Sequence, residues 1–294
     1  MGKFARPGLP QRANPPMSPL PEDEVPLRFS IATWNINSVR LRIGLVARFL
    51  SEQNPDTLCL QETKCPDGQF PLGEFRKLGY EHIALNGQKG YHGVAIVSRL
   101  PIVEASPRDF CAKGDSRHMR VRLGGGADGL EIHNFYVPAG GDEPDPAIND
   151  KFAHKLAFVD EMAAWFAAEQ IAAGRAILVG DLNIAPLEHD VWSHRALLNV
   201  VSHTPIEVEK LGRAQAAGPW LDALRRFVPA EQKLYTWWSY RSPEWAKADK
   251  GRRLDHVWVS SVLADKVEAM RVLRDARGWE RPSDHAPVIV ELAL

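Results

Sequence analysis

The chain has 294 residues, of which 45% are hydrophobic and 25% charged, and its formal net charge is −1. This composition excludes a fibrous or largely disordered chain, and the near-neutral charge excludes nucleic-acid binding through a uniformly basic surface. No apolar run is long enough to cross a bilayer, and the three cysteines form no closely spaced pair. We therefore expect a cytoplasmic protein in a reducing compartment that does not bind membranes.

Residues 1–26 differ from the rest of the chain because prolines recur throughout them without hydrophobic periodicity. Proline removes a backbone donor and blocks helix formation, so this segment is predicted to be a disordered tail. It also lacks the apolar core of a secretory signal. No linker-like stretch divides the remainder, and we expect residues 27–294 to form a single domain.

The predicted elements after the tail are short apolar strands and a few helices. Apolar residues three or four positions apart predict helices at 39–50, ended by Asn54-Pro55, and at 152–166, closed by Gly174. Residues 187–230 are expected to be helix and loop. The predicted strands occupy residues 29–34, 56–60, 93–97, 117–123, 130–138, 176–181, 234–238, 254–259, 269–273 and 286–290. Because both types of element recur in each half, we predict an α/β fold with two similar sheets meeting at a shared site.

The strand at 176–181 ends on Asp181 and is followed two residues later by Asn183. In an extended chain, residues two apart point to the same side, so both side chains can face one cavity. A carboxylate beside a carboxamide suits a hard cation or a phosphate oxygen. Asp and Asn also cap turns after strands, so this motif alone does not decide the function.

Three further strand ends carry similar residues. Asn35 and Asn37 follow the first strand, Glu62 follows the second, and Asp284-His285 precedes the last. Each has a structural explanation as a helix cap, a surface charge or a loop histidine. Together they are the residue types needed for a hydrated Mg²⁺ and a general base.

A histidine base needs a partner that orients its ring. Asp255 ends a basic run and begins an apolar strand, so a buried carboxylate there could hold the imidazole of His285. Alternatively, Asp255 pairs with Arg252 or Arg253, and the sequence leaves both options open.

These segments resemble the endonuclease/exonuclease/phosphatase superfamily in order and spacing. The shared motifs are Trp34-Asn35-Ile36-Asn37, Gln61-Glu62-Thr63-Lys64, Gly180-Asp181-Leu182-Asn183 and Ser283-Asp284-His285-Ala286-Pro287-Val288. More narrowly, the chain resembles the bacterial exonuclease III family of abasic-site endonucleases over about residues 28–294. The narrower match adds Gly87-Gln88-Lys89-Gly90, Asn134-Phe135-Tyr136-Val137-Pro138, Trp237-Trp238-Ser239-Tyr240-Arg241 and Arg253-Leu254-Asp255.

The resemblance implies a four-layer α/β sandwich of the DNase I-like type, with two mixed sheets packed face to face and flanked by helices. It implies that the catalytic residues are Tyr136, Asp181, Asn183, Asp255 and His285. The expected metal site draws on Asn35, Glu62, Asp181, Asn183, Asp284 and His285. The candidates for DNA contact are Lys89, Arg117, Trp237 and Arg241.

The implied activity is that of a DNA repair enzyme, a Mg²⁺-dependent phosphodiesterase for which Mn²⁺ can substitute. It would act as a monomer on duplex DNA, cutting 5′ to abasic sites and removing nucleotides or blocking groups from 3′ ends. Ala139 departs from the family pattern, which often has Gln or Asn there, and this puts one DNA contact in doubt. The alternatives are a small-molecule or lipid phosphoesterase and a catalytically silent nucleic-acid-binding relative. The aromatic and basic segment 235–241 argues against the first, and the retained catalytic residue types argue against the second.

A pocket that selects a sugar without its base is expected to be apolar and too small for a complete nucleotide. Trp237 is the best candidate for its wall. Because side chains alternate along a strand, Trp238 should face the opposite way, into the core.

The tail should be dispensable, since it lacks the apolar residues needed to pack a core. We predict that deletion of residues 2–25 leaves the melting temperature and the cleavage of abasic DNA nearly unchanged. Thermal melting and a cleavage assay would test this, and a large loss of either would mean that the segment docks on the domain.

Overall fold

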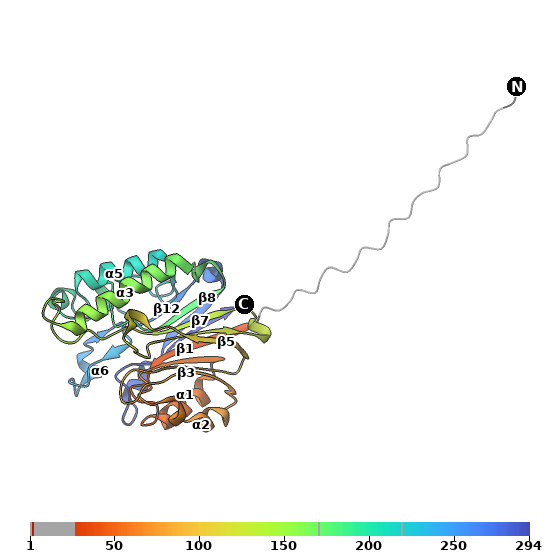
Figure 1. Ribbon diagram of the computed structural model, residues 1–294, viewed down its shortest axis with the longest axis horizontal. Coiled ribbons are helices and arrows are strands. Elements are labelled where there is room, and N and C mark those ends of the chain that lie inside the picture. The colour runs from red at the N-terminus through yellow and green to blue at the C-terminus, as the bar shows by residue number, and fades with distance from the viewer. Residues whose placement is uncertain (1, 3–26, 170, 219) are drawn as a thin grey trace.

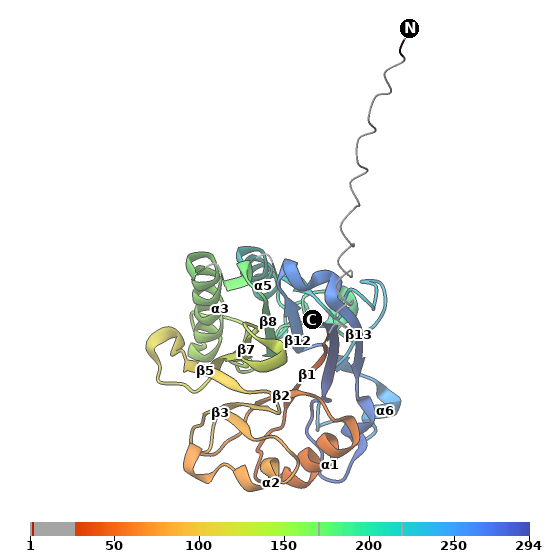
Figure 2. The same ribbon diagram turned by 90° about the vertical axis from the view of Figure 1, so that its right-hand side faces the viewer.

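The computed structural model describes Gly2 and residues 27–294, except 170 and 219. The predicted disordered tail therefore lies outside the described residues. Two six-stranded sheets pack face to face, with helices on both outer faces (Figure 1, Figure 2). The expected four-layer α/β sandwich is confirmed.

The first sheet has the strand order β13-β14-β1-β2-β4-β3. Its strands are β1 (Arg28–Asn35), β2 (Thr57–Gln61), β3 (His82–Asn86), β4 (Val94–Ser98), β13 (Val267–Val272) and β14 (Val288–Ala293). Only β1 and β2 run parallel; every other neighbouring pair is antiparallel. The helices α1 (Ile43–Gln53) and α2 (Leu72–Arg76) cover its outer face (Figure 2).

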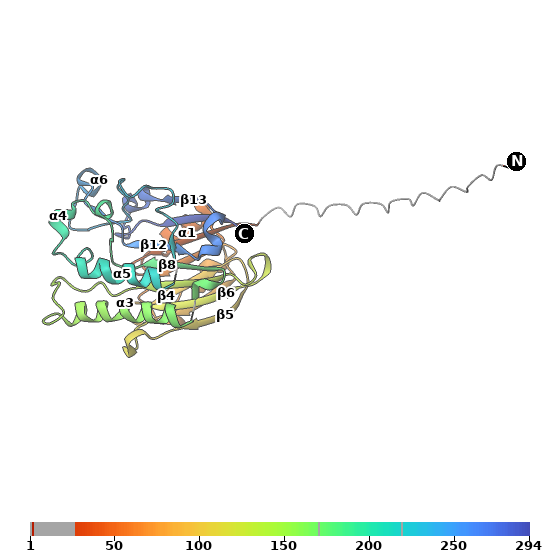
Figure 3. The same cartoon turned by 90° about the horizontal axis from the view of Figure 1, so that it is seen from above.

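The second sheet has the order β5-β6-β7-β8-β12-β9. Its strands are β5 (Ile102–Pro107), β6 (His118–Leu123), β7 (Glu131–Tyr136), β8 (Ala176–Asp181), β9 (Leu221–Asp222) and β12 (Asp255–Val259). Here β7 and β8 form the parallel pair. The helices α3 (Asp150–Glu169) and α5 (Pro205–Ala217) run side by side over its outer face (Figure 3).

Smaller elements lie at the edge of the sandwich. They are α4 (His194–Leu197), α6 (Trp245–Ala248) and a two-stranded ribbon of β10 (Trp237–Trp238) and β11 (Gly251–Arg252). Hydrophobic residues fill the space between the two sheets, and separate apolar clusters fill the space between each sheet and its helices. Burial of this apolar surface is the main force that holds the layers together.

The strands β3 and β5 were not expected from the sequence. Their side chains are mostly half-buried or exposed, so they lack the apolar run that identified the central strands. Both are edge strands, which need fewer buried residues than central ones. The expected strand 234–238 is reduced to β10, and α3 ends at Glu169, before Gly174.

The two parallel pairs place the carboxyl ends of β1, β2, β7 and β8 at one end of the sandwich. Gly180, next to the end of β8, has a φ of +141°, a conformation that favours glycine. A Cβ atom there would lie 2.0 Å from the carbonyl oxygen of Phe135 on β7. The close approach of these two strands therefore requires glycine at this position.

We predict that Gly180→Ala lowers the free energy of unfolding by roughly 3 kcal/mol, because the methyl group meets backbone that cannot move cheaply. Gly212→Ala is the matched control. Gly212 lies inside α5 with open space around it, and alanine there should stabilise the protein by about 0.5–1 kcal/mol. Chemical denaturation of both variants would test this, and equal effects would contradict it.

Candidate active site

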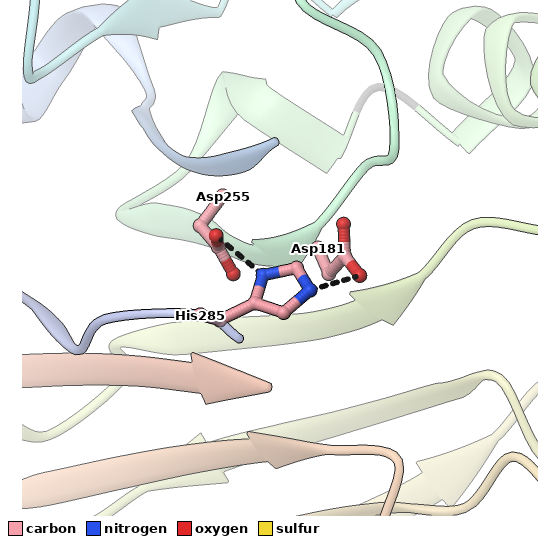
Figure 4. A group of neighbouring side chains, drawn as sticks. All are labelled: Asp181, Asp255 and His285. Carbon is pink, nitrogen blue, oxygen red and sulfur yellow. Dashed lines mark hydrogen bonds and ion pairs between the residues drawn. The ribbon is translucent and has the colours of Figure 1, made fainter. Parts of the chain in front are cut away.

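The polar strand ends predicted from the sequence come together at the end of the sandwich where the parallel pairs terminate. Asp181 ends β8 and Asp255 begins β12, and the two residues lie opposite one another in the register of these antiparallel strands. His285, just before β14 in the other sheet, inserts its ring between the two carboxylates (Figure 4). The site is therefore assembled from both sheets.

The imidazole of His285 is buried and has an acidic partner on each side. Its Nδ1 lies 2.8 Å from Oδ2 of Asp255, and its Nε2 lies 3.7 Å from Oδ2 of Asp181. Burial alone would lower the pKa of His285, but the charges of Asp255 and Asp181 outweigh it and raise the pKa well above its usual range. His285 is therefore held as an imidazolium at neutral pH.

The backbone around His285 is fixed from β1. The indole Nε1 of Trp34 donates to the carbonyl oxygen of His285 at 3.0 Å. The hydroxyl of Ser283 donates to the carbonyl oxygen of Asn35 at 2.6 Å and accepts from the backbone N–H of His285 at 3.2 Å. These bonds fix the approach of the ring to the two carboxylates.

Asp255 pairs with His285 and with neither neighbouring arginine. The hydroxyl of Thr236 donates to Oδ2 of Asp255 at 2.6 Å and helps to fix the carboxylate. Arg253 instead pairs with Asp190 and Asp222. Of the two interpretations left open by the sequence, the structure supports the orienting partner.

Asn35 connects acidic groups of the two sheets. Its side-chain amide donates to Oε1 of Glu62 at 2.9 Å and to Oδ2 of Asp181 at 2.8 Å. Burial raises the pKa of Asp181, and the nearby charge of His285 only partly opposes this rise. Burial also favours a higher pKa for Glu62, but the Lys64 ammonium and its hydrogen bonds lower it overall.

Tyr136 ends β7 and donates its hydroxyl proton to Oε1 of Glu62 at 2.9 Å. Burial and the charges of Glu62 and Asp181 raise its pKa well above the usual value, so the hydroxyl stays protonated. Arg117, expected to contact DNA, is buried, with its guanidinium 4.9 Å above the ring of Tyr136 and an ion pair to Asp115. The guanidinium therefore packs against Tyr136, and its contact with DNA stays a prediction.

Asn183 adopts a left-handed backbone conformation with a φ of +54°. Its side-chain amide donates to the carbonyl oxygen of Val137 at 2.9 Å and to Oδ2 of Asp181 at 3.1 Å. In this arrangement the amide nitrogen, rather than an oxygen ligand, faces the carboxylate. Asn183 therefore acts as a donor that fixes Asp181.

The oxygen atoms around Glu62 already attract a cation. The Lys64 ammonium lies 2.7 Å from Oε2 of Glu62 and 2.6 Å from Oδ1 of Asn37. Carboxylate and amide oxygens are the donors that a hard divalent ion prefers, so the residues fit such an ion. Both carboxylate oxygens of Asp284 have donors of their own. Its Oδ2 accepts from Nε1 of Trp237 at 2.9 Å, and its Oδ1 is 3.4 Å from Nδ2 of Asn37. Asp181, Asp255 and His285 form a second group of potential ligand atoms within 4.8 Å of one another.

A cavity of about 710 Å³ lies beside these groups, lined in part by Trp192, Trp237 and Arg241. Lys250 lies 4.7 Å above the ring of Trp192, and the guanidinium of Arg252 lies 5.3 Å above the ring of Trp237. This cavity is larger and more polar than the sugar pocket expected from the sequence, and that expectation stays a prediction. Lys250 and Arg252 place cations over both tryptophan rings. The alternation of residues along a predicted strand does not reveal such contacts.

Two of the four predicted DNA contacts, Trp237 and Arg241, line the cavity. Lys89 is exposed on the loop between β3 and β4. Sequence reasoning missed Trp192, which belongs to no motif, and Thr236, whose hydroxyl gives no recognisable pattern. Asn37 was noticed, but its role beside Lys64 depends on packing between loops.

Comparison with known proteins identifies the family. The model of the Endonuclease/Exonuclease/phosphatase family matches residues 32–285. This chain belongs to that family. The enzyme is thus a hydrolase that acts on phosphodiester bonds.

Two curated relatives of this family member are bacterial. Exodeoxyribonuclease III of Haemophilus influenzae is 28% identical over 270 residues, covering 88% of this chain and 98% of the relative. Exodeoxyribonuclease of Bacillus subtilis is 28% identical over 260 residues, covering 88% and 97%.

Solved structures of similar enzymes include an AP endonuclease from Archaeoglobus fulgidus, with a TM-score of 0.83 and 30% identity over 90% of this chain and 100% of that one. The 3′ phosphatase NExo from Neisseria, bound to a product DNA hairpin, has a TM-score of 0.82 and 30% identity over the same shares.

The adjacent tryptophans of β10 provide a test of the site. Trp237 lines the cavity, whereas Trp238 is 2% exposed and packs with Tyr235 and Trp245. We predict that Trp237→Ala lowers the cleavage rate far more than the melting temperature. Trp238→Ala should instead lower the free energy of unfolding by roughly 3–5 kcal/mol, because it empties a core position. Single-turnover cleavage and thermal melting distinguish the two, and parallel losses in both variants would show that β10 is only scaffold.

Proposed function

We propose that the protein cuts duplex DNA on the 5′ side of abasic sites and also removes nucleotides or blocking groups from 3′ ends. It is a DNA repair phosphodiesterase, in keeping with its exodeoxyribonuclease and AP endonuclease relatives. The observation that carries the proposal is the position of the tryptophan-lined cavity. Trp237 forms a β-bridge with His285 and donates to Asp284, so this wall residue links the cavity to the catalytic groups.

The chemistry of the cavity suits a nucleic acid. Arg241, Lys250 and Arg252 supply positive charge for phosphates, and the two tryptophans supply flat surfaces for a sugar or base. A cavity of about 710 Å³ has room for more than a sugar, which favours 3′-end trimming alongside cleavage at abasic sites. A lipid phosphoesterase would need an apolar wall, and this cavity carries cations on both rings.

Each buried side chain of the site has a separate role in hydrolysis of the phosphodiester. Asp181 is the group that takes a proton from the attacking water, since burial gives its carboxylate a raised pKa and two amides fix its orientation. The His285 imidazolium provides positive charge toward the phosphate, and Asp255 holds the ring in place. The protonated hydroxyl of Tyr136 donates to Glu62 and so helps to fix that carboxylate. A catalytically silent protein would have no need of this arrangement.

Glu62 is the principal residue that would hold a divalent ion, with Asn35, Asn37 and Asp284 around it. When bound, Mg²⁺ or Mn²⁺ supplies charge that stabilises the phosphate and the leaving oxyanion. The ammonium of Lys64 lies beside Glu62, where the ion would bind. The side chain of Lys64 is partly exposed and flexible, so it can move aside for the ion.

We also propose that the enzyme works as a monomer in the cytoplasm. Its three cysteines are free, which suits a reducing compartment. No helix in the described part of the chain is long and apolar enough to span a bilayer.

The test is cleavage of a labelled duplex containing one abasic analogue, with Mg²⁺ and with excess EDTA. We predict that Glu62→Gln lowers turnover by about two orders of magnitude, because the ion loses a charged ligand. Glu52→Gln is the matched control, since it changes an exposed carboxylate whose ion pair among the described residues is with Arg48 on α1. Full cleavage in EDTA would refute the metal requirement, and an intact duplex with Mg²⁺ would refute the activity at abasic sites.

A further inference from the structure

A buried ion pair outside the catalytic groups joins α3 to α5. Lys155 on α3 and Glu207 on α5 both have fully buried side chains, and Nζ of Lys155 lies 2.5 Å from Oε1 of Glu207. Burial lowers the pKa of Lys155, and the carboxylate of Glu207 opposes the shift. Replacing such a pair by apolar residues is often neutral or stabilising, so stability alone does not explain its presence.

The other contacts of the ammonium lead to the active site. Nζ of Lys155 donates to the carbonyl oxygen of Asn183 at 2.7 Å and to that of Ala139 at 3.3 Å. Asn183 lies two residues beyond Asp181, and Ala139 lies three residues beyond Tyr136. A single cation therefore ties together the segments that leave the parallel strands β7 and β8.

The loop after β7 packs directly against the lysine stem. Gly140 has a φ of +91°, and a Cβ atom there would lie 2.8 Å from Cδ of Lys155. The lysine thus contacts this loop through both its ammonium and its aliphatic chain. The contact leaves the carbonyl oxygen of Ala139 little freedom to move.

The carboxylate of Glu207 is held by donors from the segment that precedes α5. Both of its carboxylate oxygens accept from the backbone N–H of Ser202 at 2.9 Å, and Oε2 accepts from the hydroxyl of Thr204 at 2.7 Å. Ser202 in turn accepts from the guanidinium of Arg252, which covers the ring of Trp237. A continuous set of contacts therefore runs from Asn183, through the pair, to the wall of the cavity.

We infer that Lys155 and Glu207 are positioning residues. They hold the Asp181–Asn183 segment and the Trp237 wall of the cavity in the relative positions that catalysis requires. The inference rests on the proposed function of the site. The pair touches neither substrate nor reacting atoms. It acts by fixing the backbone from which the catalytic side chains project, and a displacement of about 1 Å there can cost 100-fold in rate.

The experiment compares Lys155→Met, Glu207→Gln and the double variant on the abasic-analogue duplex. Single-turnover rates at saturating enzyme report the chemical step, and a separate titration reports DNA affinity. We expect Lys155→Met to lower the rate by about 100-fold while the dissociation constant changes less than about threefold. Glu207→Gln should lower the rate about tenfold, because it weakens a charged hydrogen-bond network without emptying the site. The double variant should lose no more than Lys155→Met, since the pair acts as a unit.

Val159→Ala is the matched control, a buried truncation one turn further along α3 that touches none of the catalytic groups. It should lower the melting temperature and leave the single-turnover rate unchanged. A Lys155→Met rate within about threefold of wild type would overturn the inference, as would equal rate losses in Lys155→Met and Val159→Ala at equal loss of melting temperature. If Lys155→Met fails to fold, Glu207→Gln decides alone, and a wild-type rate for it overturns the inference. Failure of the wild-type protein to cut would overturn the proposed function and this inference together.

Discussion

The side-chain amide of Asn35 is the contact on which the active site depends. Its two N–H groups donate to Glu62 in one sheet and to Asp181 in the other. Two buried carboxylates this close would repel one another, so a neutral donor between them and a cation beside them are both needed. His285 and Lys64 supply the positive charge. The amide thereby sets the separation of the sheets at the end where catalysis occurs.

A buried pair of amide side chains also joins the two sheets. Gln61 on β2 donates to Oδ1 of Asn134 on β7 at 2.7 Å, and Nδ2 of Asn134 donates to the carbonyl oxygens of Leu60 and Ala95 at 3.0 Å. Apolar packing between sheets tolerates small slips, because it has no preferred direction. A directional network in the same space selects one alignment. The catalytic groups therefore rest on an interface that combines hydrophobic burial with a fixed register.

The central strands and the groups at their ends could be predicted from the sequence because both signals are local. An apolar run followed by Asp181 or Glu62 is visible within ten residues, whereas the partner of Asp255 was left open until the structure placed it beside His285. Contacts between distant segments could not be predicted in this way. The packing of Arg117 over the ring of Tyr136 depends on how the start of β6 meets the end of β7, and the cations above Trp192 and Trp237 depend on a loop far from Trp192 in the sequence. The edge strands β3 and β5 were missed because their residues are not buried enough to leave a pattern.

The pairing of β1 with β14 joins the first strand of the domain to its last. The first sheet consequently cannot close until nearly the whole chain is available, and this contact of long sequence separation slows folding. His285 stands just before β14, so the imidazolium reaches its carboxylates only when that strand has been added. A chain still being synthesised has Glu62, Tyr136 and Asp181 but no means of completing the site. The order of the strands thus delays assembly of the active site until β14 has joined the first sheet.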